Sequence, residues 1–278
     1  MGTRWEQSGN KRKDNRINKI QYMIFNNTML YKLIIGDISS CKGDLLLIMQ
    51  ELNKRLRNLE ILHNSIKNNS LSQVEIEIYS PYIGRAYLET SLTAILVRFD
   101  SIRVLFTKRH QDADYYETNE RSKSAIQWTG DILSPTSPGK HPWATNTYAQ
   151  GNRSLLGHWA NELIWSAAFE DFSDWCSNKS NINFWYSELL LKEPNDFCIE
   201  IRNKLDGLFS KFSKGIHSEL LNPRHYFSSS QAVYADYKQL CQNLTYLALL
   251  SHFNDHFICK LSKDKAFNYA DKISGAWL

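Results

Sequence analysis

The chain has 278 residues, a formal net charge of +4 and an apolar content of 42%. This length suits one large domain or two small ones, and the apolar content is that of a globular protein able to bury a sizeable core. The mild positive charge is well below that of a dedicated nucleic-acid coat protein. No run of about 18 apolar residues is present, so we expect no membrane association.

The five cysteines, at positions 41, 176, 198, 241 and 259, include no CxxC pair. The spacing therefore indicates neither a disulfide framework nor a zinc site. The N-terminus lacks the apolar core of a signal peptide. We expect buried free thiols in a cytoplasmic protein, and neither a metal nor another cofactor.

Residues 1–22 are polar and basic and are predicted to form a disordered tail ahead of one domain, residues 23–278. Helical spacing begins near Met29, and Gly36 and Gly43 divide it into two helices. The next helix is predicted to start at a capping box, Ser72 to Glu75, and to continue to His110. Residues 74–79 could instead form a short strand.

Residues 111–152 interrupt the helical pattern. Pro135, Pro138 and Pro142 exclude a helix or central strand there, so this stretch is predicted to be a long irregular insertion. Helical spacing returns near residue 152 and recurs over 183–191, 196–221 and 229–261, with Pro194 ending the second of these four segments. The pattern predicts an all-α fold, a single bundle of about six helices.

The helix predicted over 196–221 carries the most informative pattern. Leu205, Leu208, Phe209, Phe212, Ile216 and Leu220 form its apolar face. A line of polar side chains follows the margin of that face: Arg202, Asp206, Ser210, Ser213 and His217. Such side chains can hydrogen-bond, exchange protons or hold a phosphate, whereas a helix that only packs more often carries Ala, Lys or Glu there.

The segment LFSKFSKGIHSEL within this helix resembles a motif of helical bacterial proteins similar to the HEPN superfamily. A looser similarity covers GRAYLETSLTAILVRFD and the all-helical layout. The resemblance implies an α-helical bundle, often dimeric, that acts on RNA or nucleotides in antiphage or toxin–antitoxin systems. The family signature is Arg, four to six residues, then His; here Lys211 stands six residues before His217.

This resemblance implies a metal-independent ribonuclease centre. His217 would be the general acid or base, because an imidazole near neutrality can move a proton to or from ribose oxygens. Lys214 or Arg202 would hold the phosphate, and Ser213 and Asp206 would orient the imidazole.

Other residues could bind RNA or supply the signature. Arg57 and His63 have its spacing on a convincing helix and form an alternative catalytic pair. Lys211, Lys108 and Arg109 are candidate nucleic-acid-binding residues, because runs of cations can meet phosphate.

Two functional hypotheses therefore stay open. The first is a HEPN-like protein that binds or cleaves RNA within bacterial defence. The second is a non-catalytic helical interaction subunit of a defence complex, with the 111–152 insertion and the tryptophan-rich region 159–185 forming contacts. Both are compatible with a homodimer or a larger protein complex.

Overall fold

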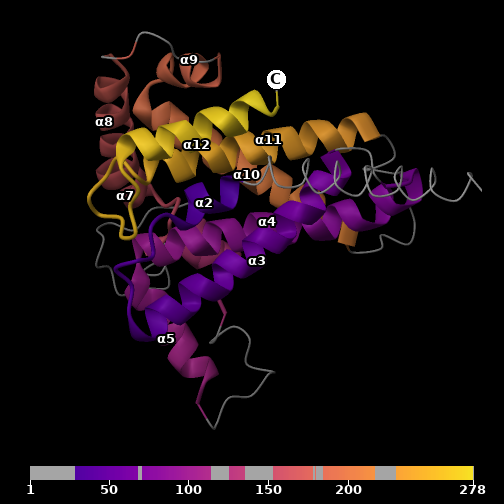
Figure 1. The fold of residues 1–278 in the computed structure, drawn as a ribbon, viewed down its shortest axis with the longest axis horizontal. Coiled ribbons are helices and arrows are strands. Elements are labelled where there is room, and N and C mark those ends of the chain that lie inside the picture. The colour runs from indigo at the N-terminus through magenta and orange to yellow at the C-terminus, as the bar shows by residue number, and fades with distance from the viewer. Residues whose placement is uncertain are drawn as a thin grey trace, which may run out of the picture.

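The computed structural model describes residues 29–67, 71–113, 125–134, 153–177, 179, 184–216 and 230–277. Within these ranges all regular elements are helices, which confirms the all-α class (Figure 1). The predicted tail, residues 1–22, lies outside the described residues. The α-helices are α2 (Leu30–Ile35), α3 (Gly43–Lys67), α4 (Gln73–Phe99), α5 (Ser101–Gln111), α7 (His158–Ala160), α8 (Ser166–Ser177), α9 (Phe184–Leu190), α10 (Pro194–Ile216), α11 (Ser230–Leu250) and α12 (Lys263–Gly275).

Local capping signals explain several helix boundaries. Gly36 and Gly43 adopt positive φ, 74° and 54°, and separate α2 from α3 as the sequence predicted. At the start of α4 the capping box is present, because the Glu75 backbone N–H donates to Ser72 Oγ and the Ser72 backbone N–H donates to Glu75 Oε2. Residues 74–79 are helical, so the strand alternative was wrong.

Two predicted boundaries were wrong. The helix expected to reach His110 ends at Phe99, because Asp100 has a non-helical backbone and its side chain caps α5 by accepting from the Arg103 backbone N–H. The last long helix ends at Leu250, and α12 follows a non-helical turn. The helix expected over 183–191 ends at Leu190, before Pro194, as predicted. Pro194 itself begins α10, where its missing N–H has no helical partner to lose.

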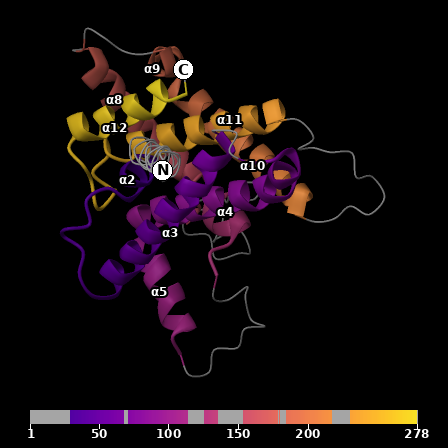
Figure 2. The same ribbon diagram turned by 45° about the vertical axis from the view of Figure 1, so that its right-hand side comes forward.

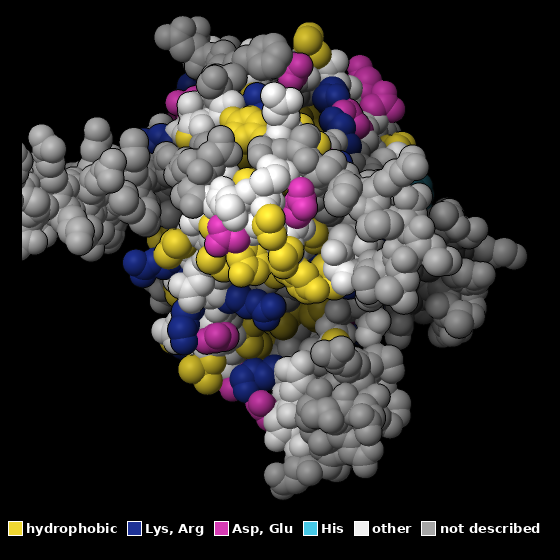
Figure 3. All heavy atoms as spheres, turned by 90° about the vertical axis from the view of Figure 1, so that its right-hand side faces the viewer, with side chains coloured by type: hydrophobic (Ala, Val, Ile, Leu, Met, Phe, Trp, Pro, Cys, Tyr) yellow, Lys and Arg dark blue, Asp and Glu magenta, His cyan; other side chains and the backbone are white. Residues whose placement is uncertain are grey.

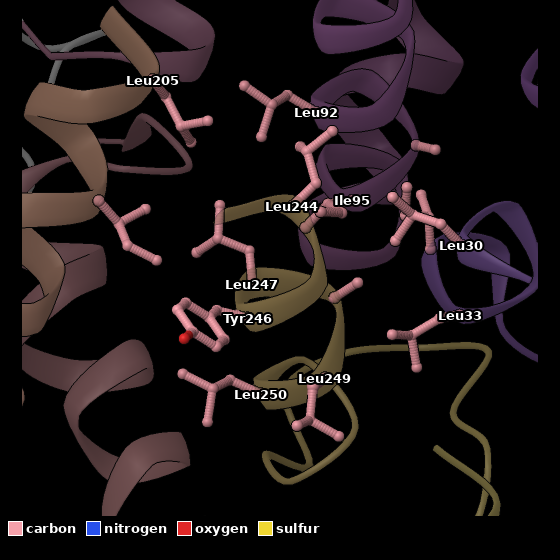
Figure 4. Close-up of a cluster of buried hydrophobic side chains, with 14 of the residues drawn as sticks. Leu30, Leu33, Leu92, Ile95, Leu205, Leu244, Tyr246, Leu247, Leu249 and Leu250 are labelled. Atoms are coloured by element: carbon pink, nitrogen blue, oxygen red, sulfur yellow. The ribbon is translucent and has the colours of Figure 1, made fainter. Parts of the chain in front are cut away.

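Helix α4 lies at the centre of the bundle. It packs against α2, α3, α10 and α11, and these neighbours surround it in both ribbon views (Figure 1, Figure 2). Figure 4 shows the aliphatic side chains that meet there, among them Leu92 of α4, Leu205 of α10, Leu244 of α11 and Leu33 of α2. Each is fully buried, and burial of one such side chain stabilises the fold by about 1.5–3 kcal/mol.

The tryptophan-rich region contributes mainly to the core. Trp165 is fully buried and donates its indole N–H to the Leu155 carbonyl at 2.7 Å. Trp185 is also buried, and its carbonyl accepts a hydrogen bond from the Tyr246 hydroxyl at 2.8 Å. These two side chains are therefore not contact residues of an outer surface. None of the described helices is both long enough and apolar enough to cross a membrane.

Gly84 of α4 lies against the Phe212 ring of α10. A Cβ at this position would lie 2.6 Å from the ring of the buried Phe212. We expect Gly84→Ala to lower the free energy of unfolding by about 1–3 kcal/mol, because the packed ring must shift. Gly207, on α10, has no atom within 4 Å of its Cβ position, so Gly207→Ala is expected to raise it by up to about 1 kcal/mol. Urea denaturation of both variants measures these opposite effects; two destabilised variants would contradict the difference in packing.

Candidate functional site: the polar edge of α10

Helix α10 buries the face that the sequence assigned to packing. Its buried side chains are Phe197, Cys198, Ile201, Leu205, Leu208 and Phe212. Phe209 and Ile216 are partly buried at the margin of this face, and Leu220 lies outside the described residues. The polar edge is therefore positioned as predicted along the described part of the helix.

Two members of this edge hold the described part of the insertion, residues 125–134. Arg202 donates from Nη2 to the Ser134 carbonyl at 2.7 Å. Asp206 accepts from the indole Nε1 of Trp128 at 3.1 Å. These hydrogen bonds engage one N–H of the guanidinium that was predicted to hold phosphate and one oxygen of the carboxylate that was predicted to orient an imidazole.

Trp128 adds an aromatic contact to this attachment. Its ring stacks on Phe209 with a centroid distance of 4.0 Å and an interplanar angle of 6°. The Arg85 guanidinium of α4 lies over the same Phe209 ring, 4.7 Å from its centroid, and also pairs with Glu89. Stacking of this kind contributes about 0.5–1.5 kcal/mol beyond the area it buries.

The 125–134 segment has two further attachments. Asp131 is buried, with 5% of its surface exposed, and pairs with Arg103 of α5 at 2.5 Å. The Asp131 and Ile132 carbonyls accept from the Leu155 and Leu156 backbone N–H groups, each at 2.8 Å. The segment is irregular, as the sequence predicted for 111–152, with Gly130 at φ 118°. The segment is nevertheless fixed to α5, to α10 and to the backbone of Leu155 and Leu156.

The remaining candidate residues of α10 lie near its C-terminal end. The Ser213 hydroxyl donates to the Phe209 carbonyl at 2.6 Å, within its own helix. Lys211 pairs with Asp236 of α11 at 2.6 Å. Lys214 is exposed. His217, the predicted general acid or base, lies outside the described residues, so the structure does not place an imidazole beside these groups.

Arg57 and His63 lie on different sides of α3. Arg57 is exposed, whereas His63 has 2% of its surface exposed and stacks between Tyr87 and Tyr237 at centroid distances of 5.5 and 4.7 Å. Six helical residues separate side chains by about 240°, so the two cannot meet on one face. The structure does not bring this alternative pair together.

The candidate phosphate-binding cations do not form one surface either. Lys211 is on α10, whereas Lys108 and Arg109 are on α5, which extends away from the bundle (Figure 1). Lys108 pairs with Asp112, and Arg109 is exposed. Arg98, one of the neighbouring basic residues, is fully buried and cannot meet an RNA.

A buried polar cluster absent from the predictions surrounds Arg98. Its guanidinium donates to the Ile34 carbonyl, the Ser251 hydroxyl and the Ile258 carbonyl at 2.8–3.1 Å and approaches His252 Nδ1 at 3.0 Å. Burial, and then the charge of Arg98, holds the pKa of His252 well below its usual value. The neutral ring donates from Nε2 to the Leu33 carbonyl at 2.8 Å. Within the described part of the chain, no group of three or more His, Cys, Asp or Glu side chains is arranged to hold a metal ion.

The attachment of Trp128 to α10 can be separated into two parts. We expect Trp128→Ala to lower the free energy of unfolding by about 2 kcal/mol, because it removes both the ring contact and the indole hydrogen bond. We expect Trp128→Phe to cost less than about 1 kcal/mol, because it keeps a ring and leaves the exposed Asp206 free to bind water. Thermal unfolding measures both; equal losses would assign the contact to the hydrogen bond alone.

Comparison of the chain with protein-family models, with curated proteins and with solved structures finds no match. The HEPN resemblance therefore stays a prediction that rests on the residues quoted for it.

Proposed function

We propose that the chain is a non-catalytic interaction subunit, and that the exposed face of α5 binds an acidic amphipathic helix of a partner protein. The observation that carries this proposal is the face itself. Ile102 and Phe106 have 65% and 68% of their surface exposed. Arg109 is exposed on the same side, since positions i, i+4 and i+7 share one helix face.

The charge of α5 determines the chemistry of the partner. The eleven residues Ser101–Gln111 contain no Asp or Glu, and of their cations Arg103 pairs with Asp131 and Lys108 with Asp112, whereas Arg109 is exposed. An apolar pair followed by an exposed arginine is complementary to an apolar segment that carries a carboxylate. Such charge complementarity favours encounter and selects the partner's orientation.

Helix α5 packs weakly against the rest of the bundle, which favours a further contact with a partner protein. Val104 is its only buried residue, whereas α4 buries residues along most of its length. An isolated helix of about 11 residues is marginal in water, and most helical stability comes from packing an apolar face. The apolar side of α5 is left largely in solvent, so a partner that covers Ile102 and Phe106 would stabilise the helix.

The α10 edge supports catalysis less well. A ribonuclease needs cations and acid–base groups that are available to the substrate. Among the described candidates, Arg202 and Asp206 hold the 125–134 segment, Lys211 pairs with Asp236, and Ser213 bonds within its own helix. These contacts give the polar edge of α10 a role in holding the fold together that does not depend on catalysis.

Other exposed apolar residues fit the proposal less well. Val74, Ile78 and Tyr82 of α4 are 62%, 54% and 51% exposed and share one helix face. Figure 3 looks onto the right-hand end of Figure 1 and shows hydrophobic side chains gathered there beside lysines and arginines. Helix α4 is already held by α3, α10 and α11, so its stability does not call for a further partner.

The test is binding by the full chain. Proteins that co-purify with it from its native cells are identified, produced separately and titrated against purified wild type, Phe106→Glu and Arg109→Glu. We expect a one-to-one complex that either substitution weakens by about tenfold or more. Leu191→Glu, at an 87% exposed leucine, and Arg57→Glu, at an exposed arginine of α3, are the matched controls and should bind as wild type.

A parallel titration with labelled single-stranded RNA distinguishes the other hypothesis. RNA that binds through Phe106 and Arg109 would contradict the proposal in favour of a nucleic-acid surface on α5. RNA cleavage by the wild type that is lost in His217→Ala would replace it with the ribonuclease hypothesis. Binding of the purified partner unchanged by Phe106→Glu would also overturn it.

A further inference from the structure

Two buried cysteines that are far apart in sequence lie in contact. Cys41 follows α2, Cys259 precedes α12, and their Sγ atoms are 3.0 Å apart across a separation of 218 residues. Both are buried, with 8% and 6% of their surface exposed, and both are free thiols. This separation is shorter than the usual contact of two non-bonded sulfurs, so little movement is needed to join them.

The backbone around this pair is tightly fixed. The Asp37 backbone N–H donates to the Cys259 carbonyl at 2.9 Å. A Cβ on Gly36 would lie 1.9 Å from that carbonyl oxygen, so the two loops approach as closely as glycine allows. Cys259 has φ 56° and, in the described ranges, is the one non-glycine residue with positive φ. Residues held in such a backbone conformation concentrate at functional sites.

We propose that Cys41 and Cys259 are a reversible redox site that forms a disulfide when the protein meets a peroxide. One of the two sulfurs attacks a peroxide oxygen, the O–O bond breaks, and the departing hydroxide takes up the thiol proton, which gives water and a sulfenic acid. The second sulfur then attacks the first and displaces hydroxide, which takes up the proton of the second thiol and leaves as a second water. In total, two thiols and one peroxide give one disulfide and two waters.

The two thiols share one buried environment. Burial raises the pKa of Cys259 well above its usual value, and the charge of nearby Arg98 acts in the opposite direction. The disulfide would join the connection between α2 and α3 to the one between α11 and α12. Because it closes a loop of more than two hundred residues, we expect oxidation to raise the melting temperature by about 10 °C.

The test uses the full chain, purified reduced and then treated with hydrogen peroxide. After alkylation of the remaining thiols, mass spectrometry should show a peptide pair joined between Cys41 and Cys259. The melting temperature should rise and return to its starting value with dithiothreitol. Cys198→Ser, at a cysteine with 4% of its surface exposed, should retain this response, whereas Cys41→Ser should lose it.

The melting temperatures of the reduced variants show that each is folded before oxidation. The proposal is overturned if wild type yields sulfinic acid at Cys41 or Cys259 without the joined peptide. It is also overturned if both thiols stay fully alkylatable under peroxide that oxidises a small thiol. Equal loss of thiol at Cys198 and at the pair would overturn it as well.

Discussion

Replacing Arg98 with methionine is expected to lower the free energy of unfolding by about 4 kcal/mol, a large part of the stability of a typical domain. The fully buried guanidinium donates hydrogen bonds to the Ile34, Ser251 and Ile258 carbonyls. Methionine fills a similar volume but donates no hydrogen bond, so these buried carbonyls lose their donor. Burial lowers the pKa of Arg98 to about 9, so the side chain remains charged at neutral pH.

Arg202→Met is the matched control for this experiment. Arg202 is half-buried and donates to one backbone carbonyl, that of Ser134, so its loss should cost about 1 kcal/mol or less. Urea denaturation of both variants shows whether losing several buried hydrogen bonds lowers the free energy of unfolding more than losing one partly buried hydrogen bond. Equal and small losses would show that Arg98 does not organise the contacts among α2, α4 and the turn after α11.

Glu60→Gln is expected to remove part of the pH dependence of stability and to destabilise the protein at acidic pH, because glutamine has one acceptor oxygen for the two backbone N–H groups that bind the two carboxylate oxygens. Burial raises the pKa of Glu60 from 4.5 to about 7, although its carboxylate accepts from the Tyr31 and Leu30 backbone N–H groups at 2.9 and 3.3 Å. The folded state therefore holds the proton more tightly than the unfolded state. The stabilisation from this proton is complete below pH 4.5 and is lost as the pH rises to about 7, a change of about 3 kcal/mol.

Urea denaturation between pH 4.5 and 8 measures this effect as the difference between wild type and Glu60→Gln. As the pH rises, the free energy of unfolding of the variant should increase relative to that of wild type. The difference should become constant above the pKa of Glu60 in the folded state. Glu75→Gln is a control with the opposite pH dependence. The hydrogen bonds from Ser72 lower the pKa of Glu75, so the contribution of the Glu75 carboxylate to stability is lost as the pH falls. Parallel curves for wild type and Glu60→Gln would mean that Glu60 is not buried as described.

The sequence predicted those parts of the fold that depend on local chemistry. Helical spacing, the glycines between α2 and α3, and the capping box at Ser72 act over a few residues. The break at Asp100 was missed because the apolar spacing continues through it. The turn after Leu250 is held by Arg98, 153 residues before Ser251, and no pattern within a window of ten residues carries that information.

The candidate site was predicted less well for the same reason. The polar edge of α10 was correctly located, but its contact with Trp128 joins residues 78 positions apart. Because the sequence does not reveal that contact, the side chains of Arg202 and Asp206 were interpreted as parts of a reactive site. Spacing alone also suggested Arg57 with His63, whereas their angular separation on α3 places only His63 in the core.

Hydrogen exchange along α5 shows whether this helix is weakly held in the isolated protein and covered by the partner. In the isolated protein, amides of Ser101–Gln111 should exchange at least about tenfold faster than those of residues 92–97 in α4, because α5 buries one residue. Addition of the purified partner should slow exchange across α5 and leave residues 202–213 of α10 unchanged. Slower exchange at the α10 edge with no change in α5 would contradict the account.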